Sequence, residues 1–203
     1  RAARRARHPV ADMDHCGIHR QVADLHLASI GQGFLSTLGP AFLTLLYESM
    51  DTADHSVLLV EIRDDCVAGF VAGGHGMGPI YRRMLGKPFR LIRALFPSLF
   101  RPERLLRILE ILRYGRATDP ALPKAELLSI AVAPAYRGQG IADALYRRLV
   151  GYFNSQGTDA FKITVGEHLG PAHRFYLRMG AEPVSSVEVH RGEGSVVYIH
   201  RLG

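Results

Sequence analysis

The sequence predicts a single α/β domain, and three observations support this prediction. The chain has 203 residues, 47% of them hydrophobic, which is enough for one well-buried core and short for two. Short runs rich in Val, Ile and Leu alternate with longer amphipathic segments, a pattern typical of strands and helices packed in layers. One such run, residues 127–132, leads through a proline into a glycine-rich turn that opens a long amphipathic segment. No internal repeat or linker divides the chain.

The first part of the chain predicts an arm and two helices. Residues 1–13 are rich in Arg and Ala without an apolar period, so we expect a mobile basic arm ahead of a domain at residues 14–203. Pro40 fits the first turn of the second helix. The first helix shows apolar residues at helical spacing: Ile18, Val22, Leu25 and Ile30. No strand is apparent before these helices.

Strand signals dominate the rest of the chain. Residues 56–63 and 66–73 are rich in Val and Leu and flank two aspartates, which predicts a β-hairpin. Gly180 suits the left-handed cap of a helix. The later elements are expected in this order: a strand at 125–133, a helix at 138–154, a strand at 159–165, a helix at 171–179 and a closing hairpin at 184–191 and 195–200.

Between the first hairpin and the next strand lie about fifty residues that include a basic segment, residues 79–118. Apolar residues recur there at helical spacing on both sides of Pro102, so we expect two amphipathic helices. This segment has ten basic and two acidic residues, so its net charge is +8, which exceeds the net charge of +6 of the whole chain. The simplest interpretation is a helical lid with solvated arginines. Guanidinium groups also bind phosphate, whether of coenzyme A, of a nucleotide-linked sugar or of an anionic membrane surface.

Composition argues against several functional classes. No apolar run approaches the roughly 20 residues of a membrane span, and no signal peptide is apparent, so we expect a soluble, cytoplasmic protein. Cys16 and Cys66 suggest neither a disulfide framework nor a metal site. His15 and His19 lie one helical turn apart without a third ligand at a recognisable spacing, so no metal is expected. Nucleic acid is not an expected partner, because no aromatic platform accompanies the basic segment.

The glycine-rich turn is the most informative motif. Gly138 and Gly140 have no side chain to hold a ligand away from the main chain. Backbone N–H groups at the start of the following helix can therefore point at an anion, and the helix dipole adds to the attraction. A glycine pair by itself is more typical of a tight strand-to-helix turn; the whole string, with its apolar run and proline before the glycines, favours a phosphate site.

The whole string resembles the acyl-CoA-binding motif of the GNAT superfamily of N-acetyltransferases, (Arg/Gln)-x-x-Gly-x-(Gly/Ala), which Arg137, Gly140 and Ala142 fill. The resemblance implies one domain with a mixed, mostly antiparallel sheet flanked by helices, with the basic segment inserted between the third and fourth strands. It also implies acetyl-CoA as the acyl donor. The turn would hold the pyrophosphate, and the open edge of the preceding strand would pair with the pantetheine arm. These roles fall on Arg137, Gly138, Gln139, Gly140, Ile141 and Ala142, and on Ile130, Ala131 and Val132 respectively.

Two residues are candidates for the proton chemistry. Tyr176, followed by Gly180, resembles the family's helix tyrosine, which acts near the coenzyme sulfur as a general acid; the alternative is a tyrosine of the core. Glu126 stands where several members place a general base, at the start of the central strand; the alternative is an exposed glutamate beside a strand. Burial beside an apolar cleft would raise the proton affinity of such a carboxylate.

Other positions depart from the family pattern or compete for roles. Leu169 replaces an asparagine that contacts the pantetheine in many members, and Thr164 occupies a second family position for a base glutamate. Glu167 and His75 are therefore further candidates for the general base, and we expect both at the acceptor side. Phe34 joins them, because its surroundings resemble GNAT members associated with sugar metabolism.

The expected function is acetyl transfer from acetyl-CoA to a primary amine of a small molecule, such as an amino sugar or nucleotide-sugar, in a ternary complex. One alternative is acetylation of a protein N-terminus or lysine. Another is a non-catalytic acyl-CoA-binding module whose basic segment binds phosphate or a membrane. The acyl chain length and the choice between monomer and homodimer stay open.

Overall fold

The computed structural model describes residues 15–30, 34–99, 122–190 and 193–203. Six strands form one sheet in the order β1-β2-β3-β4-β6-β5. The elements are α1 (His15–Ser29), the short 3-10 helix η1 (Phe34–Leu38), α2 (Pro40–Thr52), β1 (Ser56–Arg63), β2 (Cys66–Gly74), α3 (Gly78–Leu85), α4 (Pro88–Leu99), β3 (Ala125–Val132), η2 (Pro134–Tyr136), α6 (Ile141–Ser155), β4 (Ala160–Gly166), α7 (Gly170–Arg178), β5 (Glu182–His190) and β6 (Glu193–Arg201).

The sheet is mixed. Strands β3 and β4 run parallel, and every other neighbouring pair is antiparallel. This confirms the expected α/β class with a mostly antiparallel sheet. The insert helices lie between the two strands that were expected to flank them, β2 and β3. In the described residues these are the second and third strands, because none precedes Ser56.

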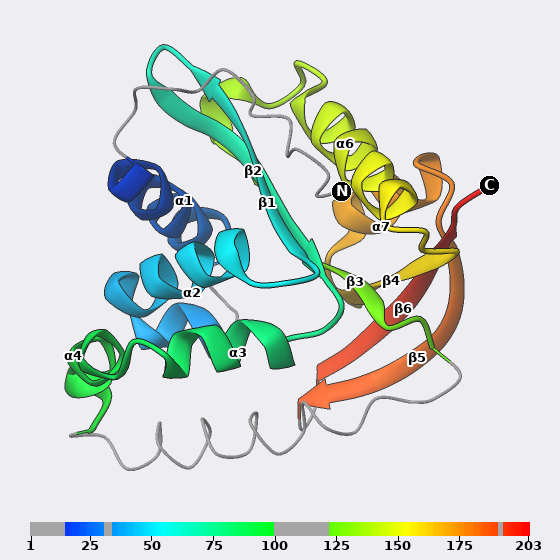
Figure 1. Cartoon of the computed structure of the whole chain (residues 1–203). Coiled ribbons are helices and arrows are strands. Elements are labelled where there is room, and N and C mark those ends of the chain that lie inside the picture. The colour runs from blue at the N-terminus through cyan, green and yellow to red at the C-terminus, as the bar shows by residue number, and fades with distance from the viewer. Residues whose placement is uncertain (1–14, 31–33, 100–121, 191–192) are drawn as a thin grey trace, which may run out of the picture.

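Helices cover both faces of the sheet (Figure 1). Helices α1, α2, α3 and α4 enclose one core, in which Leu43, Leu46 and Phe70 are fully buried. Helices α6 and α7 cover the opposite face around Tyr146, Phe153 and Phe161. The two layers are held apart by the strands, so side chains that alternate along β3 and β4 enter different cores.

Small residues on β2 let α6 approach the sheet closely. A Cβ at Gly73 would come within 2.7 Å of Leu149 Cδ1, and a Cβ at Gly69 within 3.0 Å of Ile141 Cγ2. Side chains at both positions would push the helix outward. The two glycines therefore set the distance between α6 and the sheet, including the point just after β3 where α6 begins.

The structure differs from the expected elements in the insert. The first amphipathic helix is present as α4, but α3 before it was not expected. Its signals are a proline in the first turn and Ile80 and Met84, four residues apart and both buried. The second expected helix, after Pro102, and the expected arm at residues 1–13 lie outside the described residues.

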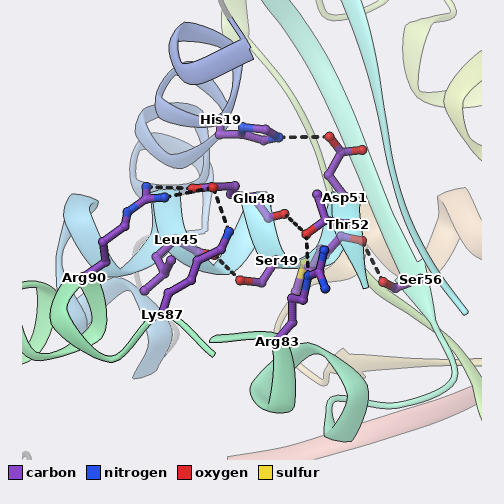
Figure 2. Close-up of polar contacts among 11 residues, drawn as sticks. His19, Leu45, Glu48, Ser49, Asp51, Thr52, Ser56, Arg83, Lys87 and Arg90 are labelled. Atoms are coloured by element: carbon purple, nitrogen blue, oxygen red, sulfur yellow. Dashed lines mark hydrogen bonds and ion pairs between the residues drawn. The ribbon is translucent and has the colours of Figure 1, made fainter. Parts of the chain in front are cut away.

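A cluster of charges fastens the insert to the domain (Figure 2). Lys87 Nζ lies 2.8 Å and Arg90 Nη2 2.7 Å from the two carboxylate oxygens of Glu48 on α2. Burial raises the pKa of Glu48, but the hydrogen bonds from Arg90 and Lys87 outweigh it and lower that pKa to about 2. Helix α4 is therefore anchored to α2 by ionic as well as apolar contacts.

Among the helices described, none has both the length and the apolar character that crossing a membrane requires.

Candidate active site where two parallel strands separate

The central feature of the site is a gap between β3 and β4. The two strands pair over only three residues each, ending at Leu127 and Ile163, although β3 continues to Val132 and β4 to Gly166. A register shift between β2 and β3 leaves Leu128 as an extra residue at the point of separation. Beyond it, no strand in the described part of the chain pairs with the facing edge of β3, which can therefore pair with an extended ligand.

The turn after β3 is shaped by its own polar groups. Arg137 Nε donates to Val132 O at 3.2 Å, and Gln139 Nε2 donates to Ala135 O at 3.3 Å. Gly138 and Gly140 both have φ of +76°, a left-handed conformation that glycine adopts without strain. Neither glycine has a heavy atom within 4 Å of where a Cβ would lie, so the turn is open on that side.

Helix α6 begins without a capping side chain. Its first hydrogen bond runs from Ala144 N–H to Gly140 O, so the N–H groups of Ile141, Ala142 and Asp143 precede the helical ladder. Together with the dipole of this 15-residue helix, they form a site suited to an anion such as a pyrophosphate.

A negative charge at this helix start would repel an anion, but it is neutralised. Asp143 accepts two hydrogen bonds from Arg178 on α7, at 2.6 and 2.9 Å. These bonds lower the pKa of Asp143 and keep it ionised. The pair also fixes the end of α7 beside the start of α6, so Arg178 both cancels the charge and sets the geometry of the turn.

Glu126 lies on β3 immediately before the gap. Its Oε2 is 3.8 Å from Lys162 Nζ on the adjacent strand, and both side chains are largely buried, with 23% and 14% of their surface exposed. Burial raises the pKa of Glu126, and the Lys162 charge opposes that rise. The net upward shift moves this carboxylate toward the range of a general base.

Tyr176 lies on the opposite face of the sheet. It is 6% exposed, and its ring centroid is 6.2 Å from that of Tyr198, which pairs with Ile163 at the end of the β3–β4 contact. Glu126 and Lys162 each precede a residue of this core by one position, so they point to the other face. Burial raises the pKa of Tyr176, so its hydroxyl stays protonated at neutral pH.

Two other candidates differ in their distance from Glu126: Glu167 lies away from it, whereas His75 directly follows Gly74, the residue of β2 that pairs with Glu126. Glu167 follows the far end of β4, five residues beyond Lys162, which is about 16 Å along a strand, and its carboxylate packs against Gly194. The His75 ring stacks on His55 and lies 6.3 Å from Phe153 near the end of α6. Burial is the main cause that lowers the pKa of His75.

The sequence also pointed to Phe34 at the acceptor side and to Leu169, which replaces an asparagine that contacts the pantetheine in many family members. Phe34 begins η1, but its side chain lies outside the part of the chain described. Leu169 precedes α7 and is 44% exposed, so it supplies no polar contact at the helix start. The structure thus places Glu126 at the start of β3, the open edge beyond it and the glycine turn after its end, with Tyr176 across the sheet.

Sequence reasoning missed a buried polar chain that ends at the gap. His26 Nδ1 lies 2.6 Å from Tyr47 Oη, which lies 3.0 Å from Ser129 Oγ on β3. Burial lowers the pKa of His26 to about 4, so its ring is neutral at neutral pH. Lys162 was missed as well, although its alternation with the apolar Phe161 and Ile163 signals a position on the other face.

A group of three or more potential ligands for a metal ion does not occur within the described residues.

The model of the acetyltransferase (GNAT) family matches residues 27–181, which include the whole gap, the turn and Tyr176. The chain belongs to this family. It is an acyltransferase, and acetyl-CoA is the acetyl donor that its family uses. The family thus agrees with what the glycine turn indicated, and the expected enzyme class and donor are confirmed.

Solved structures of other acetyltransferases share the fold of this GNAT chain at low identity. An aminoglycoside 6'-acetyltransferase type Ii is 13% identical with a TM-score of 0.60, covering 95% of this chain and 94% of its own. An aminoglycoside 6'-N-acetyltransferase complexed with coenzyme A is 12% identical with a TM-score of 0.56, covering 91% of each chain. An N-acetyltransferase from Staphylococcus aureus Mu50 is 15% identical with a TM-score of 0.55, covering 91% and 94%. No curated protein matches the chain.

Proposed function

We propose that this GNAT acetyltransferase transfers an acetyl group from acetyl-CoA directly to the primary amine of a small molecule. The observation that supports this most is the position of Glu126 and Tyr176 on opposite faces of the sheet, at the level where β3 and β4 separate. A base on one face and an acid on the other suit a reaction that proceeds through the gap between the strands.

The coenzyme is held by backbone groups. The N–H groups of the turn at residues 137–142 and the start of α6 bind its pyrophosphate. The unpaired edge of Ile130, Ala131 and Val132 binds the pantetheine arm as an added strand would. When bound, acetyl-CoA supplies an activated acyl group as a thioester. Because Leu169 offers no polar side chain, binding rests on these backbone contacts.

The chain's own residues move the protons. Glu126 accepts a proton of the acceptor ammonium at a carboxylate oxygen, and burial, which raises the pKa of Glu126, makes it a stronger base than an exposed glutamate. When acetyl-CoA is bound, Tyr176 Oη donates a proton to the coenzyme sulfur as the C–N bond forms and the C–S bond breaks, and the second proton of the amine nitrogen, released as the amide forms, restores the tyrosine hydroxyl. No acyl carrier on the protein is required, because the amine attacks the thioester directly.

The acceptor is placed on the face that carries Glu126. Helices α1, α2, α3 and α4 border that face, which limits access for a folded protein and favours a small amine. Two of the solved structures of similar fold are named as aminoglycoside acetyltransferases. Aminoglycosides contain amino sugars. We therefore propose an amino sugar or an amine of similar size.

The test is release of free thiol from acetyl-CoA in the presence of a panel of amines, amino sugars, nucleotide-linked amino sugars and short peptides. We expect thiol release with a small amine, and about a 100-fold lower kcat in Glu126→Gln. The matched control is Glu182→Gln, whose carboxylate is exposed on β5. Release with peptides alone would favour protein acetylation, and coenzyme binding without any release would favour the non-catalytic module.

A further inference from the structure

Large apolar side chains are exposed together on one part of the insert. Leu85, Phe89, Ile92 and Phe96 are 67, 87, 59 and 55% exposed, and they are four of the seven exposed large apolar residues in the described chain. The other three are spread over α7, its approach and β5. A cluster of exposed apolar side chains of this kind marks a binding surface.

These residues form a second apolar face of α4, distinct from the one that packs on the core. Phe89, Ile92 and Phe96 have the spacing i, i+3 and i+7, so they lie along one side of the helix. The core side is formed by Leu91, Ala94 and Leu95, which pack with α2. Leu85 adds to the exposed side from the end of α3.

Cations border this apolar face, and α3 and α4 themselves carry no acidic residue. Residues 78–99 contain five basic side chains and neither Asp nor Glu. Lys87 and Arg90 pair with Glu48. Arg82, Arg83 and Arg93 are exposed, and Arg93 follows Phe89 by four residues and Ile92 by one, on the border of the apolar stripe.

We propose that this α3–α4 surface, formed by Leu85, Phe89, Ile92 and Phe96 with Arg82 and Arg93, binds the surface of an anionic lipid bilayer. Phe and Leu side chains on one face with Arg beside them are the composition of helices that lie in the membrane interface. Each arginine near an anionic surface adds attraction, which salt screens. A second copy is a poorer occupant, because a twofold contact would bring arginines against arginines without a carboxylate on the surface.

The test is co-sedimentation of the full chain with vesicles of phosphatidylcholine alone and of an equimolar mixture with phosphatidylglycerol. We expect association with the anionic vesicles at low salt, little with the neutral ones, and loss of association at about 1 M salt, where the Debye length is about 3 Å. Absence of association with anionic vesicles at low salt overturns the proposal.

Paired variants locate the contact. Phe89→Ser removes an apolar anchor and should lower the vesicle partition coefficient about tenfold, whereas Val184→Ser, an exposed apolar residue on β5, should leave it unchanged. Arg93→Gln should lower it about fivefold, whereas Arg201→Gln should have little effect. Equal losses in the paired variants would overturn the assignment to this surface.

Two other occupants give distinct results. If a second copy covers the surface, the chain is a dimer without vesicles and Phe89→Ser dissociates it. If the chain's own residues 102–112 cover it, Phe89→Ser lowers the unfolding temperature. Either result combined with failure to bind anionic vesicles overturns the proposal; an unchanged unfolding temperature and a monomer that binds them support it.

Discussion

At the scale of single residues, Glu126 is subject to two effects of opposite sign. Burial favours its protonated form, and Lys162 at 3.8 Å favours the ionised one. The carboxylate must be ionised to accept a proton from the acceptor amine. Activity should therefore rise with pH through the pKa of Glu126, which lies above the ordinary value of about 4.3.

Lys162→Met should shift the acid limb of the profile of kcat/KM against pH to higher pH by about one unit, because removing the positive charge raises the pKa of Glu126 further. The measurement is kcat/KM for the amine between weakly acid and neutral pH. Lys162→Arg keeps the charge and should leave the limb in place. An unchanged limb in Lys162→Met would remove Glu126 as the titrating base.

Tyr176→Phe should lower kcat about 10- to 100-fold and leave the dissociation constant of acetyl-CoA nearly unchanged, because only the donated proton is lost. Burial raises the pKa of Tyr176, so its hydroxyl remains a donor at neutral pH. Steady-state kinetics and calorimetric binding separate the two quantities. Tyr81→Phe on α3 is the control, and equal turnover of the two variants would exclude the role of Tyr176.

At the scale of elements, a left-handed glycine lies at each end of α6. Gly140 and Gly157, on either side of α6, have φ of +76° and +67°, and neither has a heavy atom within 4 Å of where a Cβ would lie. Alanine at either position should therefore cost stability to a similar degree, about 1 kcal/mol. The two glycines differ in their position relative to the coenzyme, because only Gly140 precedes the N–H groups that would bind pyrophosphate.

Gly140→Ala should weaken coenzyme A binding about tenfold or more, while Gly157→Ala should leave it unchanged, because a strained turn moves the N–H groups of α6. Calorimetric titration with coenzyme A measures both. Equal affinity in the two variants would mean that the turn does not hold the coenzyme.

Helix α4 depends on Glu48 of α2. Its pKa is lowered to about 2 in the folded state, so its contribution to stability is present above the unfolded value of about 4.3 and is lost as pH falls from there toward 2. Glu48→Gln should therefore lower the free energy of unfolding by about 1–2 kcal/mol at neutral pH, a value reduced for partial exposure.

Thermal unfolding of Glu48→Gln at neutral and acid pH checks whether the stabilisation by Glu48 is lost as pH falls. The unfolding temperature should fall by about 5 °C at neutral pH and by much less near pH 2 to 3, where the carboxylate of the unmodified chain is largely protonated when unfolded. Glu182→Gln, exposed at the sheet edge, should be nearly neutral at both. A loss that is constant over pH would argue against the ionic anchor.

Local pattern predicted most elements because it reflects local physics. Strand β1 and helix α2 lie where apolar runs and a first-turn proline indicated them. Helix α3 was missed because it is only eight residues long and its apolar residues flank two arginines in a basic run. Its formation depends on burial of Ile80 and Met84 against α2, a tertiary contact that spacing alone does not give.

At the scale of the whole molecule, the site is made by two strands that separate. The glycine turn could be read from residues 137–142, because backbone conformation is encoded locally. The gap could not, since it depends on a register shift at Leu128 and on where β3 and β4 stop pairing. The polar chain of His26, Tyr47 and Ser129 could not either, because it joins residues from three elements.

The most direct test of the account is amide hydrogen exchange with and without coenzyme A, followed peptide by peptide. If the coenzyme lies in the gap, added coenzyme A should slow exchange at residues 130–132 and 138–143 and leave β1 and the insert helices α3 and α4 unchanged. Protection confined to other parts of the chain, with none at the open edge of β3 or the start of α6, would contradict it.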